Sequence, residues 1–482
     1  MNLTDYAQHD ALGLAELVRR RDVSAAELAR TGLQAIAALN PALNAVIETY
    51  DEAPNRLAEP DAGAVFGGVP FLLKDIGSHD AGVTFELGSR LAQGLQAPPF
   101  ASELVNRFRA TGVTVLGRTN IPELGSSCST EPLLHGPTRN PWNPARTPGG
   151  SSGGAAAAVA AGMVPIAHAN DAGGSIRWPA ACCSLFGLKP SRNLNPVGPD
   201  AALALNGLAA EHIVSRSVRD SAAMLDATAG PDAGAWCWTP RHEGSYLAAL
   251  QQEPGRLRIA LNLVPTFPPT PLQDDVVASI RATAALCESL GHHVEEATLD
   301  FDHETVLQAF SIIWSTSLRA GIEGLSALTG RAPSADTLEP HVLAAYRDGG
   351  TVSAARLHWA LDQMNTVSRA YGRLFQRYDV MLTPAGAMAP FELGRIPALP
   401  TGTFYEFFIA MCAHCPFLST ANIAGIPAMS VPLGWSADGL PIGSHFLGPM
   451  GGEVGLLQLA AQLEQAQPWQ HRTPPLHVSK LG

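Results

Sequence analysis

Charged side chains are scarce: only 15% of the 482 residues are Asp, Glu, Lys or Arg. Acidic residues outnumber basic ones, 43 against 31, which leaves a net charge of −12 at pH 7. Binding to nucleic-acid phosphates requires a basic surface, so we expect no nucleic acid partner. The low charge also argues against a coiled coil or a disordered chain, whereas 46 Gly and 38 Pro are typical of a loop-rich enzyme.

The sequence contains no long hydrophobic run. Its longest small and apolar stretch, about residues 155–169, is too short and too rich in Gly and Ala to span a bilayer. Residues 1–20 carry polar and charged groups throughout and lack the apolar core of a secretory signal. We therefore expect no membrane partner and a cytoplasmic location.

Cysteine is also sparse, with seven residues scattered along the chain. An odd, scattered set does not form a disulfide framework and fits reduced thiols in a cytoplasm. Only Cys412 and Cys415 have the spacing of a metal or redox site. Because no second Cys pair or His pair accompanies them, we interpret them as a buried structural pair and predict no metal site.

Two glycine- and serine-rich clusters stand out, at 149–154 and 173–175. Glycine-dense loops allow backbone N–H groups to approach a ligand closely, because no Cβ is in the way. Between the clusters, residues 155–162 predict a helix of small residues and 164–167 a short buried strand. A flexible linker would contain neither. This arrangement predicts two hydroxyls and several N–H donors around one point.

A lysine ends a second buried segment. Gly67 and Gly68 form a turn, residues 69–73 predict an apolar strand, and Lys74 follows at its end. An isolated lysine is normally a solvated surface group. At the end of a buried strand it is instead in the usual place for a functional residue in an α/β protein.

These segments resemble the amidase signature family. The similarity lies in GGSSGG, in DAGGSIR around Ser175, in the ending CSLFGLKP and in GVPFLLKD around Lys74. Related segments extend over roughly residues 10–465. The details of HANDAGGSIR and EHIVSRSVRDSAAMLD are most similar to the branch that contains 6-aminohexanoate cyclic-dimer hydrolases.

The resemblance implies one large α/β/α domain over residues 1–482, with a twisted mixed sheet covered by helices. Its core would comprise 65–230 and 375–465. Residues 302–377 read as mostly helical, and we expect a helical insert at about 300–375 near the substrate funnel, although simple core packing is an equal alternative. Alignment of the flanking motifs places the Gly125, Ser126 and Ser127 turn at the acyl pocket, where it would bind substrate.

The family also implies a mechanism and an assignment of residues. Ser175 would attack the carbonyl carbon, and Ser151, after a cis Gly150–Ser151 peptide bond, would relay the proton to Lys74. The backbone N–H groups of a nest would bind the oxyanion. We assign that oxyanion hole to Ala172, Gly173, Gly174 and Ser175, and we expect Asp171 and Arg177 to form its scaffold.

We expect hydrolysis of a small amide, linear or cyclic, or of an aryl carbamate (urethane), without cofactor, by a monomer or homodimer. Asn170 replaces the Ser or Thr of many relatives, and we interpret His168 as a packing residue.

The alternative function is the glutamine-hydrolysing subunit of a tRNA-dependent amidotransferase. An α/β-hydrolase elbow at Ser151 is excluded because residues 140–148 cannot form the required strand.

Overall fold

The computed structural model describes residues 1–56, 63–265 and 267–481. In this part of the chain an 11-stranded sheet has the order β1-β3-β2-β4-β6-β5-β10-β11-β9-β7-β8. The sheet is mixed, as predicted: β2 pairs parallel with β3 and β4, whereas β4, β6, β5, β10, β11 and β9 pair antiparallel in turn. The strands are β1 Val46–Thr49, β2 Pro70–Lys74, β3 Thr114–Thr119, β4 Ile166–Asp171, β5 Phe186–Lys189, β6 Ala210–Ser215, β7 Arg258–Leu261, β8 His293–Glu296, β9 Val380–Pro384, β10 Ala428–Trp435 and β11 Pro441–Leu447.

Helices cover both faces of the sheet. Along β2, Leu72 packs in the cluster that contains α6 and α7, whereas Phe71 and Leu73 pack in the cluster that contains α2 and α5. This alternation is the two-residue period of a strand buried on both faces. The helices of these layers are α2 Ala11–Arg19, α3 Ala25–Leu43, α5 Glu103–Ala110, α6 Gly153–Ala160, α7 Arg177–Cys183, α8 Val218–Thr228, α10 Asp274–Ser289 and α16 Glu453–Ala466.

Helix α6 explains the run of small residues in the sequence. All eight of its residues are buried. A Cβ on Gly154 would lie 2.5 Å from the carbonyl oxygen of Ala45 and from backbone atoms of Asn120. Only glycine allows this approach, so the helix can lie in the centre of the molecule with neighbouring backbone on several sides.

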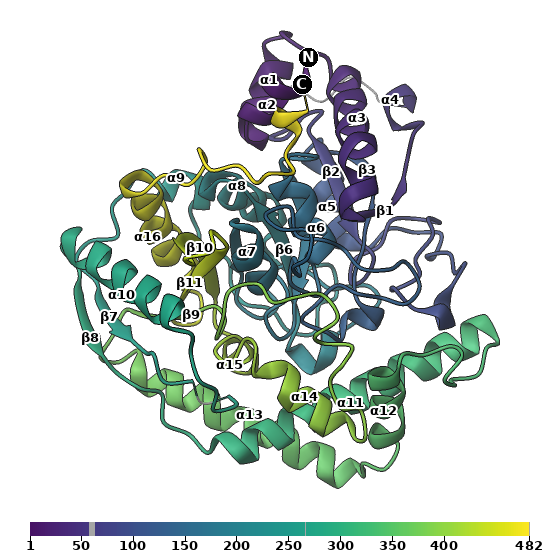
Figure 1. Ribbon diagram of the computed structural model, residues 1–482, viewed down its shortest axis with the longest axis vertical. Coiled ribbons are helices and arrows are strands. Elements are labelled where there is room, and N and C mark those ends of the chain that lie inside the picture. Colours follow the sequence, from purple (N-terminus) through teal and green to yellow (C-terminus); the bar gives the residue numbers. More distant parts are fainter. Residues whose placement is uncertain (57–62, 266, 482) are drawn as a thin grey trace.

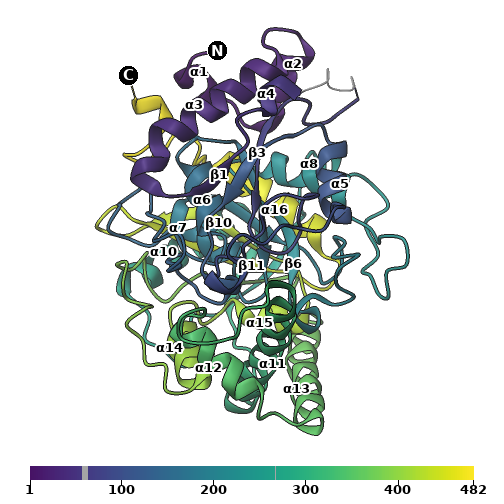
Figure 2. The same ribbon diagram turned by 90° about the vertical axis from the view of Figure 1, so that its right-hand side faces the viewer.

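A separate group of helices lies at the end of the molecule opposite α1 and α2, as Figures 1 and 2 show. Residues 302–377 are mainly helical, as expected, and α11 contacts α12, α13 and α14. The N- and C-terminal segments meet at the other end, where α1 contacts the 3-10 helix η4 (Figure 1). The remaining elements are α1 Leu3–Gln8, α4 Ala53–Arg56, α9 Tyr246–Ala249, α11 His303–Thr329, α12 Pro340–Gly349, α13 Ala354–Leu374, α14 Phe404–Cys412, α15 Ser419–Ala424, η1 Arg90–Ala92, η2 Glu123–Gly125, η3 Ala204–Gly207 and η4 Val478–Lys480.

Candidate active site

Two neighbouring parallel strands bring the functional residues together. The register of β2 and β4 pairs Phe71 with Ile166 and Leu72 with Ala167. Because parallel strands end at the same edge of a sheet, Lys74 and Asp171 both lie at that edge, where residues 172–175 leave β4.

Lys74 is only 1% exposed. Its Nζ atom lies 2.7 Å from Oγ of Ser151, 2.5 Å from Oδ1 of Asn170 and 3.5 Å from the carbonyl oxygen of Asn170. Burial lowers the pKa of Lys74 to about 7, although the negative charges of Glu211 and Asp171 act in the opposite direction. A lysine in this environment is available as the neutral amine near neutral pH.

The Gly150–Ser151 peptide bond is cis, as the family resemblance implies. A Cβ on Gly150 would lie 2.6 Å from the carbonyl oxygen of Ser127 and 2.7 Å from backbone atoms of Cys128 and Ser129. The 125–129 loop and the 149–154 loop, both predicted to lie at the site, therefore touch backbone to backbone.

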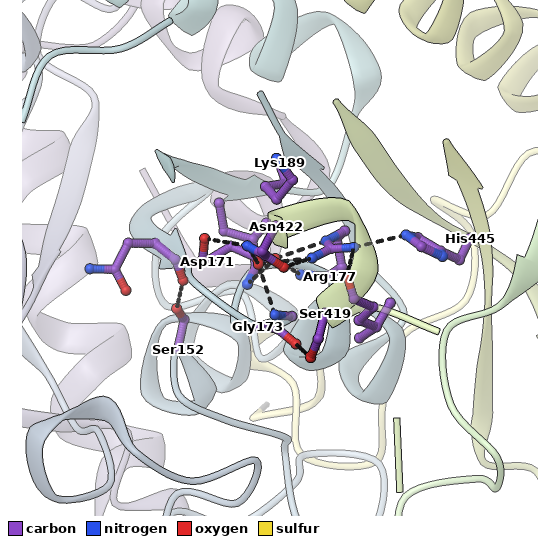
Figure 3. A network of polar contacts seen from close by, with 12 residues as sticks. Ser152, Asp171, Gly173, Arg177, Lys189, Ser419, Asn422 and His445 are labelled. Carbon is purple, nitrogen blue, oxygen red and sulfur yellow. Dashed lines mark hydrogen bonds and ion pairs between the residues drawn. The ribbon is translucent and has the colours of Figure 1, made fainter. Parts of the chain in front are cut away.

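Asp171 and Arg177, the two expected scaffold residues, form a fully buried ion pair. Arg177 donates from Nε to Oδ2 and from an Nη to Oδ1 of Asp171, both at 2.9 Å (Figure 3). Burial alone would raise the pKa of Asp171, but the charge and hydrogen bonds of Arg177 hold that pKa well below its ordinary value. Asp171 is therefore an anion and accepts hydrogen bonds from the loop that follows it.

One of these bonds involves Gly174, a residue of the predicted oxyanion hole. The backbone N–H of Gly174 donates to Oδ1 of Asp171 at 2.8 Å, so it is not free for a ligand. By contrast, the backbone N–H groups of Ala172, Gly173 and Ser175 have no side-chain acceptor among the described residues. Of the four predicted donors, the N–H of Gly174 is therefore the one that the Asp171 carboxylate already engages.

Residues from α15 and β11 complete this network, as Figure 3 shows. Asn422 donates from Nδ2 to Oδ1 of Asp171 at 2.8 Å and accepts from Arg177 at 2.6 Å. Ser419 donates to the carbonyl oxygen of Gly173 at 3.1 Å, and His445 lies 2.9 Å from Arg177. Ser419 thus bonds to the 173–175 loop directly, whereas Asn422 and His445 hold the Asp171–Arg177 pair beside it. None of the three was predicted from the sequence.

Ser175 lines a cavity that is otherwise largely apolar. The predicted turn of Gly125, Ser126 and Ser127 lies on the same cavity, and a Cβ on Gly125 would be 3.4 Å from Oγ of Ser151. The further lining residues are Cys128, Gly150, Gly173, Gly174, Trp178, Phe310, Trp314, Phe408, Met411, Cys412, Cys415 and Ser419. Helix α11 therefore reaches the site through Phe310 and Trp314.

Two residues behind Lys74 have contacts that sequence reasoning did not predict. His168 packs against Phe108, as a packing residue would, but its Nδ1 also accepts the backbone N–H of Lys74 at 3.3 Å. Its Nε2 lies 2.8 Å from Oε2 of the buried Glu211. The interpretation of His168 as packing alone was therefore incomplete, and Glu211 was missed because its strand was not predicted.

The cysteine thiols and the possible metal ligands can also be placed in the structure. All seven cysteines are free thiols, and burial raises the pKa values of Cys128 and Cys412 well above the ordinary thiol value. Cys412 and Cys415 are buried, as predicted, and both line the cavity. Among the residues that the structure describes, no group of three or more His, Cys, Asp or Glu side chains is placed to hold a metal ion.

Within the same described ranges, no helix combines the length and apolar character that crossing a membrane would require.

Comparison with known proteins extends these findings to the whole chain. The family model "Amidase" matches residues 27–457. The 6-aminohexanoate-cyclic-dimer hydrolase of Paenarthrobacter ureafaciens is 35% identical over 97% of this chain and 96% of its own.

Two solved structures are similar as well. A 6-aminohexanoate cyclic dimer hydrolase complexed with substrate has a TM-score of 0.90 at 33% identity, covering 98% of this chain and 99% of that one. A bacterial aryl acylamidase of the amidase signature family has a TM-score of 0.86 at 27% identity, and the match covers 96% of this chain and 97% of the aryl acylamidase chain. The chain therefore belongs to the amidase family and is a hydrolase of amide C–N bonds.

Proposed function

We propose that this amidase acts through an acyl-enzyme on Ser175, with Ser151 relaying a proton to Lys74. The observation that carries the proposal is the 2.7 Å contact between Nζ of Lys74 and Oγ of Ser151, made by a buried lysine whose pKa is lowered to about 7. A base with a pKa near the working pH combines the correct protonation state with sufficient basicity.

The contacts of Lys74 also support the direction of proton transfer. A neutral amine has two N–H donors and one lone pair. Both oxygens of Asn170, at 2.5 and 3.5 Å, accept N–H groups of Lys74. The lone pair is then left for Ser151, at 2.7 Å, so Ser151 donates its proton to Lys74 and can accept one from Ser175.

In the proposed acylation step, Oγ of Ser175 forms a bond to the carbonyl carbon while its proton passes through Ser151 to Lys74. The backbone N–H groups of Ala172, Gly173 and Ser175 stabilise the oxyanion. The C–N bond then breaks, and the proton returns through Ser151 to the departing amine. A water molecule, deprotonated by the same relay, releases the carboxylic acid from Ser175.

The cavity indicates the substrate class. Aromatic and thioether side chains from α11 and α14 surround it, including Phe310, Trp314, Phe408 and Met411. We therefore infer a small substrate with an uncharged aliphatic or aryl acyl group, in a linear or cyclic secondary amide. The names of the similar proteins, a 6-aminohexanoate-cyclic-dimer hydrolase and an aryl acylamidase, are consistent with this class, and an aryl carbamate fits the same acyl chemistry.

The amidotransferase alternative is less well supported. Free glutamine carries an ammonium and a carboxylate group, and no charged side chain occurs among the described residues that line the cavity. We propose a monomer or homodimer that acts in the cytoplasm without nucleic acid, which is consistent with seven unpaired cysteines and the acidic composition.

Labelling with an aryl sulfonyl fluoride, followed by peptide mapping, tests this proposal. We expect one adduct, on Ser175, and much slower labelling of Lys74→Ala. Ser152→Ala is the matched control, because Ser152 donates to the carbonyl oxygen of Asn170 and is not part of the cavity lining. An adduct on Ser152 instead, or unchanged labelling of Lys74→Ala, would refute the relay. Glutaminase activity of the purified chain would favour the amidotransferase subunit.

A further inference from the structure

Glu211 lies behind Lys74, in β6, and is 4% exposed. The antiparallel register of β4 and β6 places it directly opposite Asn170. Its Oε1 accepts a hydrogen bond from Nδ2 of Asn170 at 3.2 Å, and its Oε2 lies 2.8 Å from Nε2 of His168. Glu211 therefore contacts two side chains of β4 that both touch Lys74.

The hydrogen bonds of His168 define which of its ring nitrogens carries the proton. Its Nδ1 accepts the backbone N–H of Lys74 at 3.3 Å. In a neutral imidazole the other nitrogen then carries the proton, so Nε2 donates to Glu211. One oxygen of Glu211 thus holds the imidazole ring that is bonded to the backbone of Lys74.

The orientation of the Asn170 amide is fixed in the same way. Its Nδ2 donates to Glu211 and to the carbonyl oxygen of Ile76, both at 3.2 Å. The reversed amide would place Oδ1 against two acceptors that have no proton to offer. Oδ1 must therefore face the opposite direction, toward Nζ of Lys74 at 2.5 Å.

We propose that Glu211 is a positioning residue for amide hydrolysis, which holds the oxygen rather than the nitrogen of Asn170 toward Lys74. The proposal rests on the proposed role of Lys74 as the base. A reversed Asn170 would donate an N–H group to the lone pair of Lys74 and compete with the proton of Ser151. By preventing this reversal, Glu211 keeps the lone pair available for the relay.

Glu211 also acts through its charge. Burial is the main influence on the pKa of Lys74, and among the opposing charges that of Glu211 outweighs that of Asp171. Loss of the Glu211 charge therefore lowers the pKa of Lys74 further. Since the base must be unprotonated, the acidic limb of the kcat/KM profile moves to lower pH.

The other groups that face Lys74 differ from Glu211 in their partners. Glu211 bonds to neutral side chains, whereas the neighbouring carboxylates are paired with arginines. Helix α6, which packs on β2, contains only Gly, Ala and Val. The remaining facing groups are Asp171 with Arg177, Asp75 with Arg118, and the neutral His168.

The test is the pH dependence of Glu211→Gln with a p-nitroanilide substrate. We expect kcat to fall about tenfold while KM stays within about twofold, because Glu211 is not part of the cavity lining. We expect the acidic limb of kcat/KM to move down by about one pH unit, since a charged neighbour typically shifts a pKa by that order. A merely structural role would not move this limb.

Three further variants complete the experiment. Glu211→Asp keeps the charge, so its acidic limb should stay near the wild-type pH. Glu453→Gln is the matched control: Glu453 is 1% exposed and accepts the backbone N–H of Ser191 at 2.7 Å, and its loss should leave the limb unmoved. Asn170→Leu removes the side chain that connects Glu211 to Lys74 and should lower kcat without changing KM. This variant tests the proposal even if Glu211→Gln fails to fold.

The outcomes separate this inference from the proposed function. An acidic limb in Glu211→Gln that stays in place or moves up, or a wild-type kcat in Asn170→Leu, would overturn the positioning role. Wild-type activity in Lys74→Ala would overturn the relay itself. An inactive Lys74→Ala combined with an unshifted Glu211→Gln profile would refute only the role of Glu211.

Discussion

Replacement of Lys74 by Met should make the protein more stable at neutral pH while abolishing its activity. The pKa of Lys74 is lowered from 10.5 to about 7 by burial. Between these two pH values the unfolded chain binds a proton at this side chain that the folded chain does not bind. The free energy of unfolding of the wild type therefore rises with pH through this window.

The magnitude follows from the size of the shift. Each pKa unit corresponds to about 1.4 kcal/mol, so the full window is worth on the order of 5 kcal/mol. In Lys74→Met this pH-dependent contribution is absent. The stability advantage of the variant should be largest at about pH 6–7 and should shrink steadily toward pH 10, on top of a constant difference from altered packing.

Denaturant unfolding of both proteins at several pH values between 6 and 10 provides the measurement. All other titrating groups are common to both, so their contributions cancel in the difference. Lys189→Met is a matched control, because Lys189 is also 1% exposed and burial likewise lowers its pKa to about 7. A pH-independent difference for Lys74→Met, beside a pH-dependent one for Lys189→Met, would show that Lys74 is not held neutral.

Four other substitutions have clear expected outcomes. Ser175→Ala should reduce kcat by several orders of magnitude with an unchanged melting temperature, and near-normal turnover would exclude Ser175 as the nucleophile. Gly174→Ala should cost about 1–3 kcal/mol of stability and lower kcat, because Gly174 has φ +132° and its Cβ would lie 2.7 Å from Leu418. In Gly173→Ala the nearest atom to the new Cβ would be 3.4 Å away, so a thermal melt should show a smaller loss of stability. Trp314→Ala should raise the kcat/KM of long-chain over short-chain acyl anilides by about tenfold, and an unchanged ratio would mean that α11 does not define the acyl pocket.

Some elements could be predicted from local patterns. The apolar run before Lys74 is strand β2, as its sequence pattern predicts. This segment follows the local rules for strands. The helix of small residues was also predicted, because the helical pattern persists within the glycine-rich stretch.

Strand β6 was missed for a physical reason. It begins with Ala210, Glu211 and His212, and polar residues in this pattern normally indicate a surface segment. Here all six residues are buried, because β4 supplies the hydrogen-bond partners of Glu211 and α8 supplies Ser221 for His212. Local sequence does not reveal a partner that arrives through tertiary pairing.

The scaffold of the 173–175 loop shows the same limit. Asp171 and Arg177 could be paired from their closeness in sequence, and the structure contains that pair. Asn422 and His445, however, lie 245 and 268 positions beyond Arg177. The hydrogen bond from the N–H of Gly174 to Asp171 likewise depends on a loop geometry that no residue pattern specifies.

The placement of lysines has a practical consequence for attaching this enzyme to a support. The chain contains three lysines, Lys74, Lys189 and Lys480. The first two are buried, whereas Lys480 is exposed on η4, which packs against α1. Figures 1 and 2 show this end of the molecule opposite α11 and α14, whose side chains line the cavity. Coupling through lysine amines should therefore tether the enzyme by the end of the molecule opposite the two helices α11 and α14.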